Sequence, residues 1–272
     1  MDLLTCLEDL RELLGHRPTG LFVDIDGTLA PIASTPGEAS VSPEARGALE
    51  ALADRMTVVA LTGRSVTDAR RIIGLDSITY AGNHGLEWWW RGEASVVPEA
   101  VPYGWRLRSL IQDATRRLKD ISGLLVEDKG VTLALHYRLA KDPDAAQDSI
   151  LAFLRDTPSA RGFVHRVGKM LVEVNPPVQA NKGTALQRVV REDGLRSALA
   201  LGDDRTDLDA FRAVRTLRRD AGFRGLTVAV QGPGAPEELL SEADYTLPDT
   251  HAVERLLGWL VEASRATEGP SG

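Results

Sequence analysis

The chain has 272 residues and carries 32 basic against 39 acidic side chains, which gives a formal net charge of −7. That length allows one large α/β domain or a core domain with an insertion, and the negative balance argues against nucleic acid as a partner, because binding a phosphate backbone needs a basic surface. The only cysteine, Cys6, excludes an internal disulfide and a cysteine-rich zinc site, and fits a reducing compartment.

The segment from Met1 to Gly15 mixes acidic residues with leucines, as an amphipathic helix does. A secretion signal would instead be basic and apolar. No apolar run in the sequence approaches the roughly twenty residues of a membrane-spanning helix. We therefore expect a cytoplasmic, monomeric protein that does not contact membranes.

The first strong signal is an apolar run, Leu21 to Val23, that ends at Asp24-Ile25-Asp26-Gly27-Thr28. The run predicts a buried strand, and residues two apart in a strand face one side, so Asp24 and Asp26 can share a site at its carboxyl end. Open α/β sheets bind their ligands at that edge. Two neighbouring carboxylates repel each other unless a cation lies between them, and Mg²⁺ prefers oxygen ligands. The alternative is a simple Asp-Gly turn with a solvated Asp24.

Strands and helices then alternate along the chain, which indicates a parallel sheet with right-handed crossovers. A loop from Ala30 to Ser42 precedes the first of these helices, and Ser42 and Ser65 are expected to cap helices. Among the tryptophans Trp88 to Trp90, we expect one buried ring in a strand. The predicted elements are a helix at 43–54, a strand at 56–61, a helix ending at 73 and a strand at 78–81.

Between about residues 103 and 175 the pattern changes to a helix followed by a hairpin, used twice. Such a unit makes an antiparallel sheet with helices on one face, so we treat it as an inserted domain. We therefore predict an α/β fold, a Rossmann-like parallel-sheet core with an inserted α+β cap domain, with expected bounds of 1–103 and 176–272 for the core and 104–175 for the cap. The expected cap elements are helices at 105–121 and 143–156 and strands at 124–128, 131–137, 163–167 and 170–174.

After Pro176-Pro177 the alternating pattern resumes, and the tail from Thr267 to Gly272 is expected to be disordered. One strand in this part ends at the acidic sequence Gly202-Asp203-Asp204. The predicted elements are helices at 182–192, 206–214 and 253–263 and strands at 198–201, 226–230 and 245–247.

A parallel sheet would bring several polar strand and helix ends to Asp24, and phosphoryl transfer needs such a set. Asp24 would be the nucleophile and Asp26 the general acid and base. Asp203 would complete a Mg²⁺ site with the Asp24 carboxylate and the Asp26 carbonyl, and Asp204 or Asp207 would be a further ligand or would orient Lys182. Thr62 and Lys182 would hold the phosphate. Taken singly, each of these signals has a structural alternative. Thr62 could cap a helix, Lys182 could be a solvated helix residue, and Gly202-Asp203-Asp204 could be a simple turn.

These motifs resemble those of the haloacid dehalogenase-type phosphatases. The likeness rests on Asp24-x-Asp26-Gly27-Thr28, Thr62-Gly63-Arg64, Lys182-Gly183 and Gly202-Asp203-Asp204-x-Thr206-Asp207, with a departure at Leu208, where an acidic residue is common. Four further segments, residues 82–87, 126–130, 135–138 and 168–174, are similar to the trehalose-6-phosphate phosphatase branch. The resemblance covers roughly Gly20 to Trp259. It implies Mg²⁺ as cofactor, a sugar phosphate as substrate, and substrate-binding roles for Thr28, Gly63, Arg64, Asn83, His84, Glu127, Lys129, Arg138, Lys169 and Glu173.

The inserted domain is expected to act as a lid that recognises the sugar. Strand alternation predicts one polar sheet face, which suits hydroxyls that both donate and accept hydrogen bonds. A solvated face with weak ion pairs is the alternative. Other sugar phosphates, such as sucrose phosphate or a glucosylglycerol phosphate, and a non-catalytic sensor remain as rivals. The polar side is expected to hold Glu127 with Lys129, His136 with Arg138, and Lys169 with Glu173, and the apolar side Val126 with its neighbouring leucines, Met170, Val172 and Val174.

Overall fold

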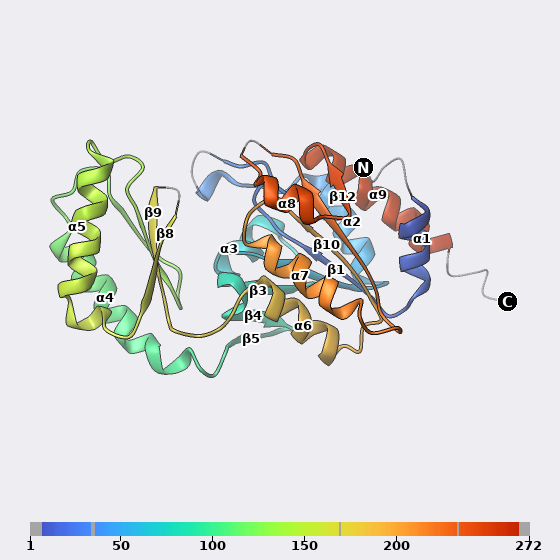
Figure 1. The fold of residues 1–272 in the computed structure, drawn as a ribbon, viewed down its shortest axis with the longest axis horizontal. Coiled ribbons are helices and arrows are strands. Elements are labelled where there is room, and N and C mark those ends of the chain that lie inside the picture. Colours follow the sequence, from blue (N-terminus) through green and yellow to red (C-terminus); the bar gives the residue numbers. More distant parts are fainter. Residues whose placement is uncertain (1–6, 34–35, 169, 233, 267–272) are drawn as a thin grey trace. The chain divides into compact units, whose positions relative to one another are not determined.

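The computed structural model describes residues 7–33, 36–168, 170–232 and 234–266 (Figure 1). The chain divides into two compact units, and the described residues of each are treated separately: a core unit, within Met1–Ser95 and Ala180–Gly272, and an inserted unit, within Val96–Gln179. Cys6, Lys169 and the tail from Thr267 lie outside the described residues. None of the helices within the described ranges is both long and apolar enough to cross a membrane.

The core unit is built on an eight-stranded sheet of order β12-β11-β10-β1-β2-β3-β4-β5. Strands β1 to β3 and β10 to β12 run parallel, and β4 pairs antiparallel with β3. The chain adds strands on one side of β1 first and on the other side later, so β1 lies where the strand order reverses. The strands are β1 (Thr19–Val23), β2 (Thr57–Leu61), β3 (Thr79–Gly82), β4 (Glu87–Trp90), β5 (Glu93–Val96), β10 (Ser197–Gly202), β11 (Arg224–Val230) and β12 (Tyr245–Leu247).

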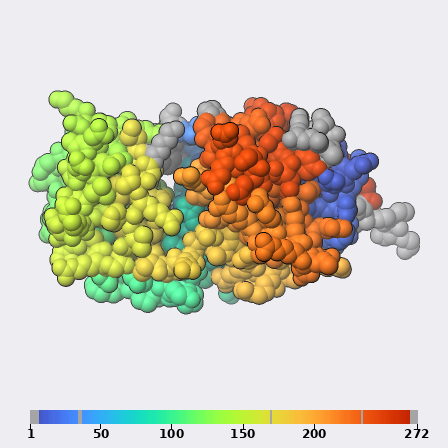
Figure 2. Space-filling model, viewed as in Figure 1, coloured from blue at the N-terminus to red at the C-terminus, as the bar shows by residue number. Residues whose placement is uncertain are grey.

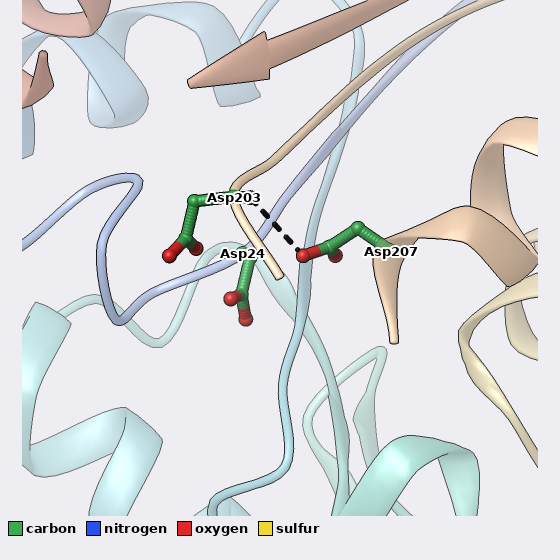
Figure 3. A group of neighbouring side chains, drawn as sticks. All are labelled: Asp24, Asp203 and Asp207. Atoms are coloured by element: carbon green, nitrogen blue, oxygen red, sulfur yellow. Dashed lines mark hydrogen bonds between the residues drawn. The ribbon is translucent and has the colours of Figure 1, made fainter. Parts of the chain in front are cut away.

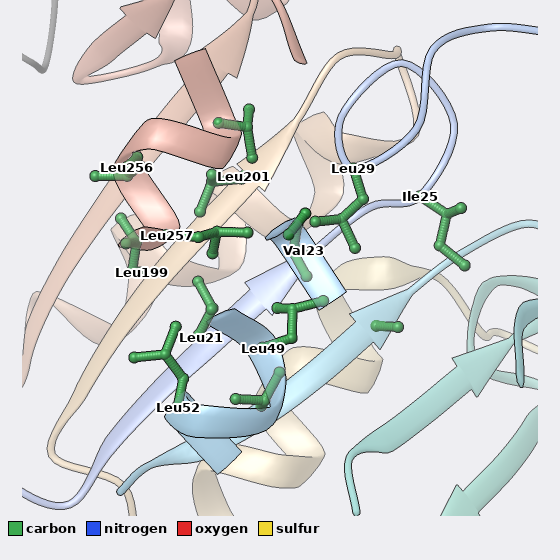
Figure 4. Close-up of a cluster of buried hydrophobic side chains, with 14 of the residues drawn as sticks. Leu21, Val23, Ile25, Leu29, Leu49, Leu52, Leu199, Leu201, Leu256 and Leu257 are labelled. Atoms are coloured by element: carbon green, nitrogen blue, oxygen red, sulfur yellow. The ribbon is translucent and has the colours of Figure 1, made fainter. Parts of the chain in front are cut away.

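Helices cover both faces of this sheet. On one face, leucines of α2 and α9 pack on Leu21 and Val23 of β1 (Figure 4). On the other, α6 and α7 contact each other and the strands (Figure 1), and their atoms form much of the core surface in Figure 2. Because β1 is buried on both sides, all five of its residues are shielded from water. The helices are α1 (Glu8–Gly15), α2 (Pro43–Ala53), α3 (Val66–Ile73), α6 (Lys182–Glu192), α7 (Asp207–Leu217), α8 (Glu237–Glu242) and α9 (Thr250–Ala266), with 3₁₀ turns η2 (Pro36–Glu38) and η3 (Asn83–Gly85).

Two helix caps predicted from the core sequence are confirmed. The Ser42 side chain accepts a hydrogen bond from the amide of Ala45, and Ser65 accepts one from Asp68. Helix α6 has the predicted bounds, with a capping box at Asn181. The last helix was predicted too short, and β5 and α8 were not predicted, because short polar elements carry little apolar periodicity.

The inserted unit is a four-stranded antiparallel sheet of order β6-β7-β9-β8 with two helices on one face. Apolar side chains of the helices, such as Leu110 and Ile150, pack on Leu135 and Val172 of the sheet. The predicted fold class is therefore confirmed. Its elements are α4 (Gly104–Arg117), β6 (Leu125–Asp128), β7 (Leu133–His136), α5 (Pro143–Asp156), β8 (Val164–Gly168) and β9 (Leu171–Asn175), with 3₁₀ turns η4 (Val101–Tyr103) and η5 (Pro158–Ala160).

Two apolar residues of the inserted unit are exposed where burial was predicted. Leu125 was expected on the buried side, but it lies opposite His136 on the polar side and is 54% exposed. Met170 was also expected to be buried, yet it precedes β9 in a turn, has φ of 64° and is 43% exposed. Alternation predicts a face only within a strand, so it fails for a residue in the turn.

Candidate active site

The site begins where β1 ends. Asp24 follows Val23, donates its amide hydrogen bond to the carbonyl of Leu201 in β10, and is only 6% exposed. The chain then turns at Gly27, which has φ of 78°. A Cβ there would lie 2.0 Å from Oδ2 of Asp203, so only glycine allows Asp203 to come this close to the turn.

Three buried carboxylates meet at this edge of the sheet, from Asp24, Asp203 and Asp207 (Figure 3). Each offers an oxygen, and these oxygens lie within 4.8 Å of one another. Thr28, predicted to bind substrate, donates its hydroxyl to Oδ1 of Asp203 at 3.2 Å. An all-oxygen set of this kind suits a hard divalent cation.

Lys182 lies among the carboxylates. Its Nζ is 2.9 Å from Oδ1 of Asp24 and 2.7 Å from Oδ1 of Asp207, and the side chain is 2% exposed. The lysine is the first residue of α6, and a Cβ on the next residue, Gly183, would lie 2.3 Å from the carbonyl oxygen of Asp209 in α7. The Lys-Gly pair therefore places an ammonium beside Asp24 while two helices approach closely.

Asp207 has both carboxylate oxygens engaged by protein groups. Oδ1 accepts from Lys182, and Oδ2 accepts from the amides of Asp203 at 3.2 Å and Asp204 at 3.0 Å. These bonds fix the loop after β10 and orient the ammonium. The side chain of Asp204 instead accepts from the amide of Arg205, so it is not one of the three clustered carboxylates.

Burial dominates the electrostatics of the cluster. Desolvation raises the pKa of Asp24 well above its ordinary value, although Lys182 opposes that change. Desolvation and the neighbouring Asp207 raise the pKa of Asp203 to about 7. For Lys182, burial lowers the pKa, but Asp207 and Asp24 outweigh it and keep the ammonium charged. One buried cation against three carboxylates leaves negative charge that a divalent metal would neutralise.

Asp26 points its carboxylate to Arg64. The guanidinium donates from Nε and Nη2, both at 2.6 Å, and its Nη1 donates to Asp68 at 2.5 Å. Burial would lower the pKa of Arg64, but the bonds to Asp26 raise it. The pair is bidentate and orients the Asp26 side chain in this structure.

The predicted phosphate-binding loop at the end of β2 is built around Thr62, which is 1% exposed. Its hydroxyl accepts from the amide of Arg64 at 3.1 Å. A Cβ at Gly63 would come within 2.7 Å of the His84 ring, so His84 packs beside this loop. Both Asn83 and His84 adopt left-handed φ values, 47° and 57°, which is rare for two residues in succession and often marks a functional position.

The inserted unit carries the other predicted substrate-binding residues. Glu127 and Glu173 flank Ala134 in one row across the sheet, and Lys129 Nζ lies 3.8 Å from Oε1 of Glu173. Arg138 lies beyond the end of β7 and is exposed, and Lys169 is outside the described residues. His136 was not among the predicted site residues. The signal that could have identified it is its predicted place on the polar side of the strand, together with Arg138.

A hollow of about 500 Å³ lies at the amino-terminal ends of the core strands. Its lining includes Arg55, Trp90 and Asp193, and none of the predicted site residues. The carboxylates of Asp24, Asp203 and Asp207 cluster at the opposite ends of the strands, where the sequence predicts the site.

The family model described as trehalose-phosphatase matches residues 22–243. The chain belongs to the trehalose-phosphatase family. The resemblance predicted from the motifs is thereby confirmed, and this phosphatase family together with the acidic cluster supports a divalent metal.

The chain is similar to curated proteins, some named trehalose-phosphate phosphatase and some not, and to solved structures. A probable trehalose-phosphate phosphatase of Sinorhizobium fredii is 32% identical over 250 residues, covering 88% of this chain and 86% of that protein. An uncharacterized glycosyl hydrolase of Mycobacterium tuberculosis is also 32% identical, and the match covers 85% of this chain but only 17% of that much longer protein. A solved trehalose-6-phosphate phosphatase related protein superposes with a TM-score of 0.76 at 24% identity, covering 92% of this chain and all of the other. At that identity the likeness concerns the fold.

Proposed function

We propose that this chain is a Mg²⁺-dependent phosphatase that hydrolyses trehalose 6-phosphate to trehalose and inorganic phosphate. The observation that carries the proposal is Lys182, buried between Asp24 and Asp207 beside Asp203 at the end of β1. A module that only binds a sugar phosphate does not need a buried nucleophile, its cation and a metal site together. Family membership favours trehalose 6-phosphate among sugar phosphates.

The reaction has two steps at phosphorus. A carboxylate oxygen of Asp24 attacks the phosphoryl group, the bond to the sugar oxygen breaks, and Asp26 gives its proton to the departing oxygen. Asp26 then takes a proton from water, whose oxygen attacks the aspartyl-phosphate and releases phosphate and free Asp24. The protons balance, because Asp26 ends the cycle protonated as it began.

The other residues bind and orient. Lys182 and Thr62, with backbone amides after Asp26, hold the non-bridging oxygens of the phosphate. Asp24 and Asp203, with the Asp26 carbonyl, would hold Mg²⁺, which when bound neutralises charge on the phosphoryl group. Asp207 orients Lys182 and the loop after β10, and the bidentate contact supports a role for Arg64 in orienting Asp26.

The polar face of the inserted sheet would recognise the sugar. Paired acidic and basic side chains suit hydroxyl groups, and the helices pack on the opposite face. The contacting residues would be Glu127, Lys129, Arg138, Lys169 and Glu173. The monomeric state and the cytoplasmic location remain predictions.

The test is phosphate release with and without Mg²⁺ from trehalose 6-phosphate, sucrose 6-phosphate, glucose 6-phosphate and a glucosylglycerol phosphate. We expect strong Mg²⁺-dependent preference for trehalose 6-phosphate. Preference for another ester would retain the core chemistry and overturn the sugar assignment. Release from none of them would favour a non-catalytic sensor.

A further inference from the structure

The polar face of the inserted sheet contains a contact that involves a residue outside the predicted set. His136 Nε2 lies 2.7 Å from Oε2 of Glu127, on the neighbouring strand. In the register, Glu127 pairs with Ala134, and His136 pairs with Leu125, so the contact runs diagonally between β6 and β7. Diagonal neighbours on one sheet face are within reach of long side chains.

Partial burial shows that these polar side chains are held on the sheet. The side chains of His136 and Glu127 are 24% and 29% exposed, and those of Lys129 and Glu173 are 15% and 30% exposed. A freely solvated glutamate or lysine would extend into water and sample many rotamers. The polar face therefore presents charged groups in defined positions.

The two carboxylates of this face differ in how they are held. Glu173 has a cation 3.8 Å away, a distance that allows attraction without a direct hydrogen bond. Glu127 has a direct contact from an imidazole that lies on the adjacent strand and has only two side-chain torsions. A glutamate has three, so the imidazole restricts the more flexible partner.

We propose that His136 is a positioning residue for sugar recognition, and that it acts through Glu127. By donating from Nε2 to Oε2, the imidazole holds the Glu127 carboxylate in one orientation before the substrate arrives. A carboxylate fixed in advance binds hydroxyl groups without the entropy cost of ordering its own side chain. This inference rests on the proposed function, because it concerns how that reaction selects its sugar.

The chain offers a matched control on the same sheet. His165 in β8 pairs with Val174, whose side chain packs in the core under the helices, so His165 belongs to the opposite face from Glu127, and it is exposed. Substituting His165 therefore tests whether removing an imidazole from this sheet affects the reaction wherever the imidazole lies.

The experiment is a double-mutant cycle with His136→Ala, Glu127→Ala and the double variant, measured with trehalose 6-phosphate and with p-nitrophenyl phosphate. We expect His136→Ala to raise KM for trehalose 6-phosphate roughly ten-fold, the effect of one hydrogen bond to a charged group, with little change in kcat. The p-nitrophenyl ester lacks the sugar, so its hydrolysis should be unaffected. In the Glu127→Ala background, His136→Ala should cause no further loss, because a residue that acts through Glu127 has nothing left to position.

Two further variants test whether the effect depends on the hydrogen bond from residue 136. His136→Gln retains a donor of similar reach and should recover part of the affinity, and His165→Ala should behave as wild type. Additive losses in the cycle would overturn the proposal in favour of direct sugar binding by His136. Equal losses with both substrates, or no change in KM, would also overturn it. Failure of the proposed function looks different, because the wild-type protein itself would then prefer another ester in the panel or release no phosphate.

Discussion

Two regions of this chain that gather charged side chains, the end of β1 and the polar face of the inserted sheet, differ in their surroundings. At the end of β1, Lys182 is 2% exposed and contacts Asp24 and Asp207 within 2.9 Å. On the polar face of the inserted sheet, Lys129 is 15% exposed and its distance to Glu173 is 3.8 Å. Buried charges must be compensated at short range, whereas partly exposed charges are also screened by water. We therefore expect substitutions in the first region to cost more stability than substitutions in the second.

The largest expected effect comes from the nucleophile. Asp24→Asn should lower turnover of trehalose 6-phosphate by at least about 10³-fold, because an amide does not form the phosphoryl-enzyme. Phosphate release measures the loss, and circular dichroism checks the fold. As a matched control, Asp204→Asn should lose less than about ten-fold, since Asp204 is outside the carboxylate cluster. Wild-type turnover in Asp24→Asn would rule out this nucleophile.

Removing the buried cation should lower stability as well as activity, because Lys182 both compensates the carboxylates and is proposed to hold the phosphate. Lys182→Met leaves Asp24, Asp203 and Asp207 without a compensating charge, which should lower the free energy of unfolding by about 3–5 kcal/mol in metal-free protein. Urea denaturation in EDTA measures this loss, and added Mg²⁺ should restore part of it by binding the folded state. An unchanged unfolding midpoint would show that the ammonium is not needed to compensate the cluster.

Metal-free protein should lose stability as pH rises. Burial raises the pKa of Asp203 to about 7 from an ordinary value of 3.8, so the folded state binds this proton more tightly than the unfolded state. The stabilising contribution is complete below pH 3.8 and is lost as pH rises through about 7. Denaturation in EDTA at pH 5 to 8 should show the decline, and Asp203→Asn should reduce it. An identical pH dependence in the variant would exclude Asp203 as its source.

The smallest effect on stability is expected in the inserted unit. Lys129→Met removes a partly exposed partner that lies 3.8 Å from Glu173, and should change the free energy of unfolding by less than about 1 kcal/mol. Its kcat/KM for trehalose 6-phosphate should nevertheless fall roughly ten-fold, the effect of one lost charged contact, while p-nitrophenyl phosphate hydrolysis stays unchanged. A loss of stability as large as that of Lys182→Met would contradict the contrast between the two regions.

Much of the core could be predicted because its signals are local. The run before Asp24 predicts a buried strand, Ser42 and Ser65 cap their helices as expected, and α6 begins at Lys182 as expected. The hairpin strand β5 and helix α8 were not found, because short elements with few apolar residues have no periodic pattern. Met170 was misplaced because it lies in the turn before β9, and Leu125 because it lies two residues before Glu127 in β6 and so shares the polar face.

The sequence by itself determined which chemical groups are available and at which strand ends they lie, because strand and helix signals are local and parallel strands end at one edge. It also identified the family. Only the tertiary structure decided which groups meet: Lys182 contacts Asp207, Arg64 contacts Asp26, and His136 contacts Glu127. Those pairings join residues that are distant along the chain or on separate strands, and they depend on packing, register and side-chain rotamers that no local pattern encodes.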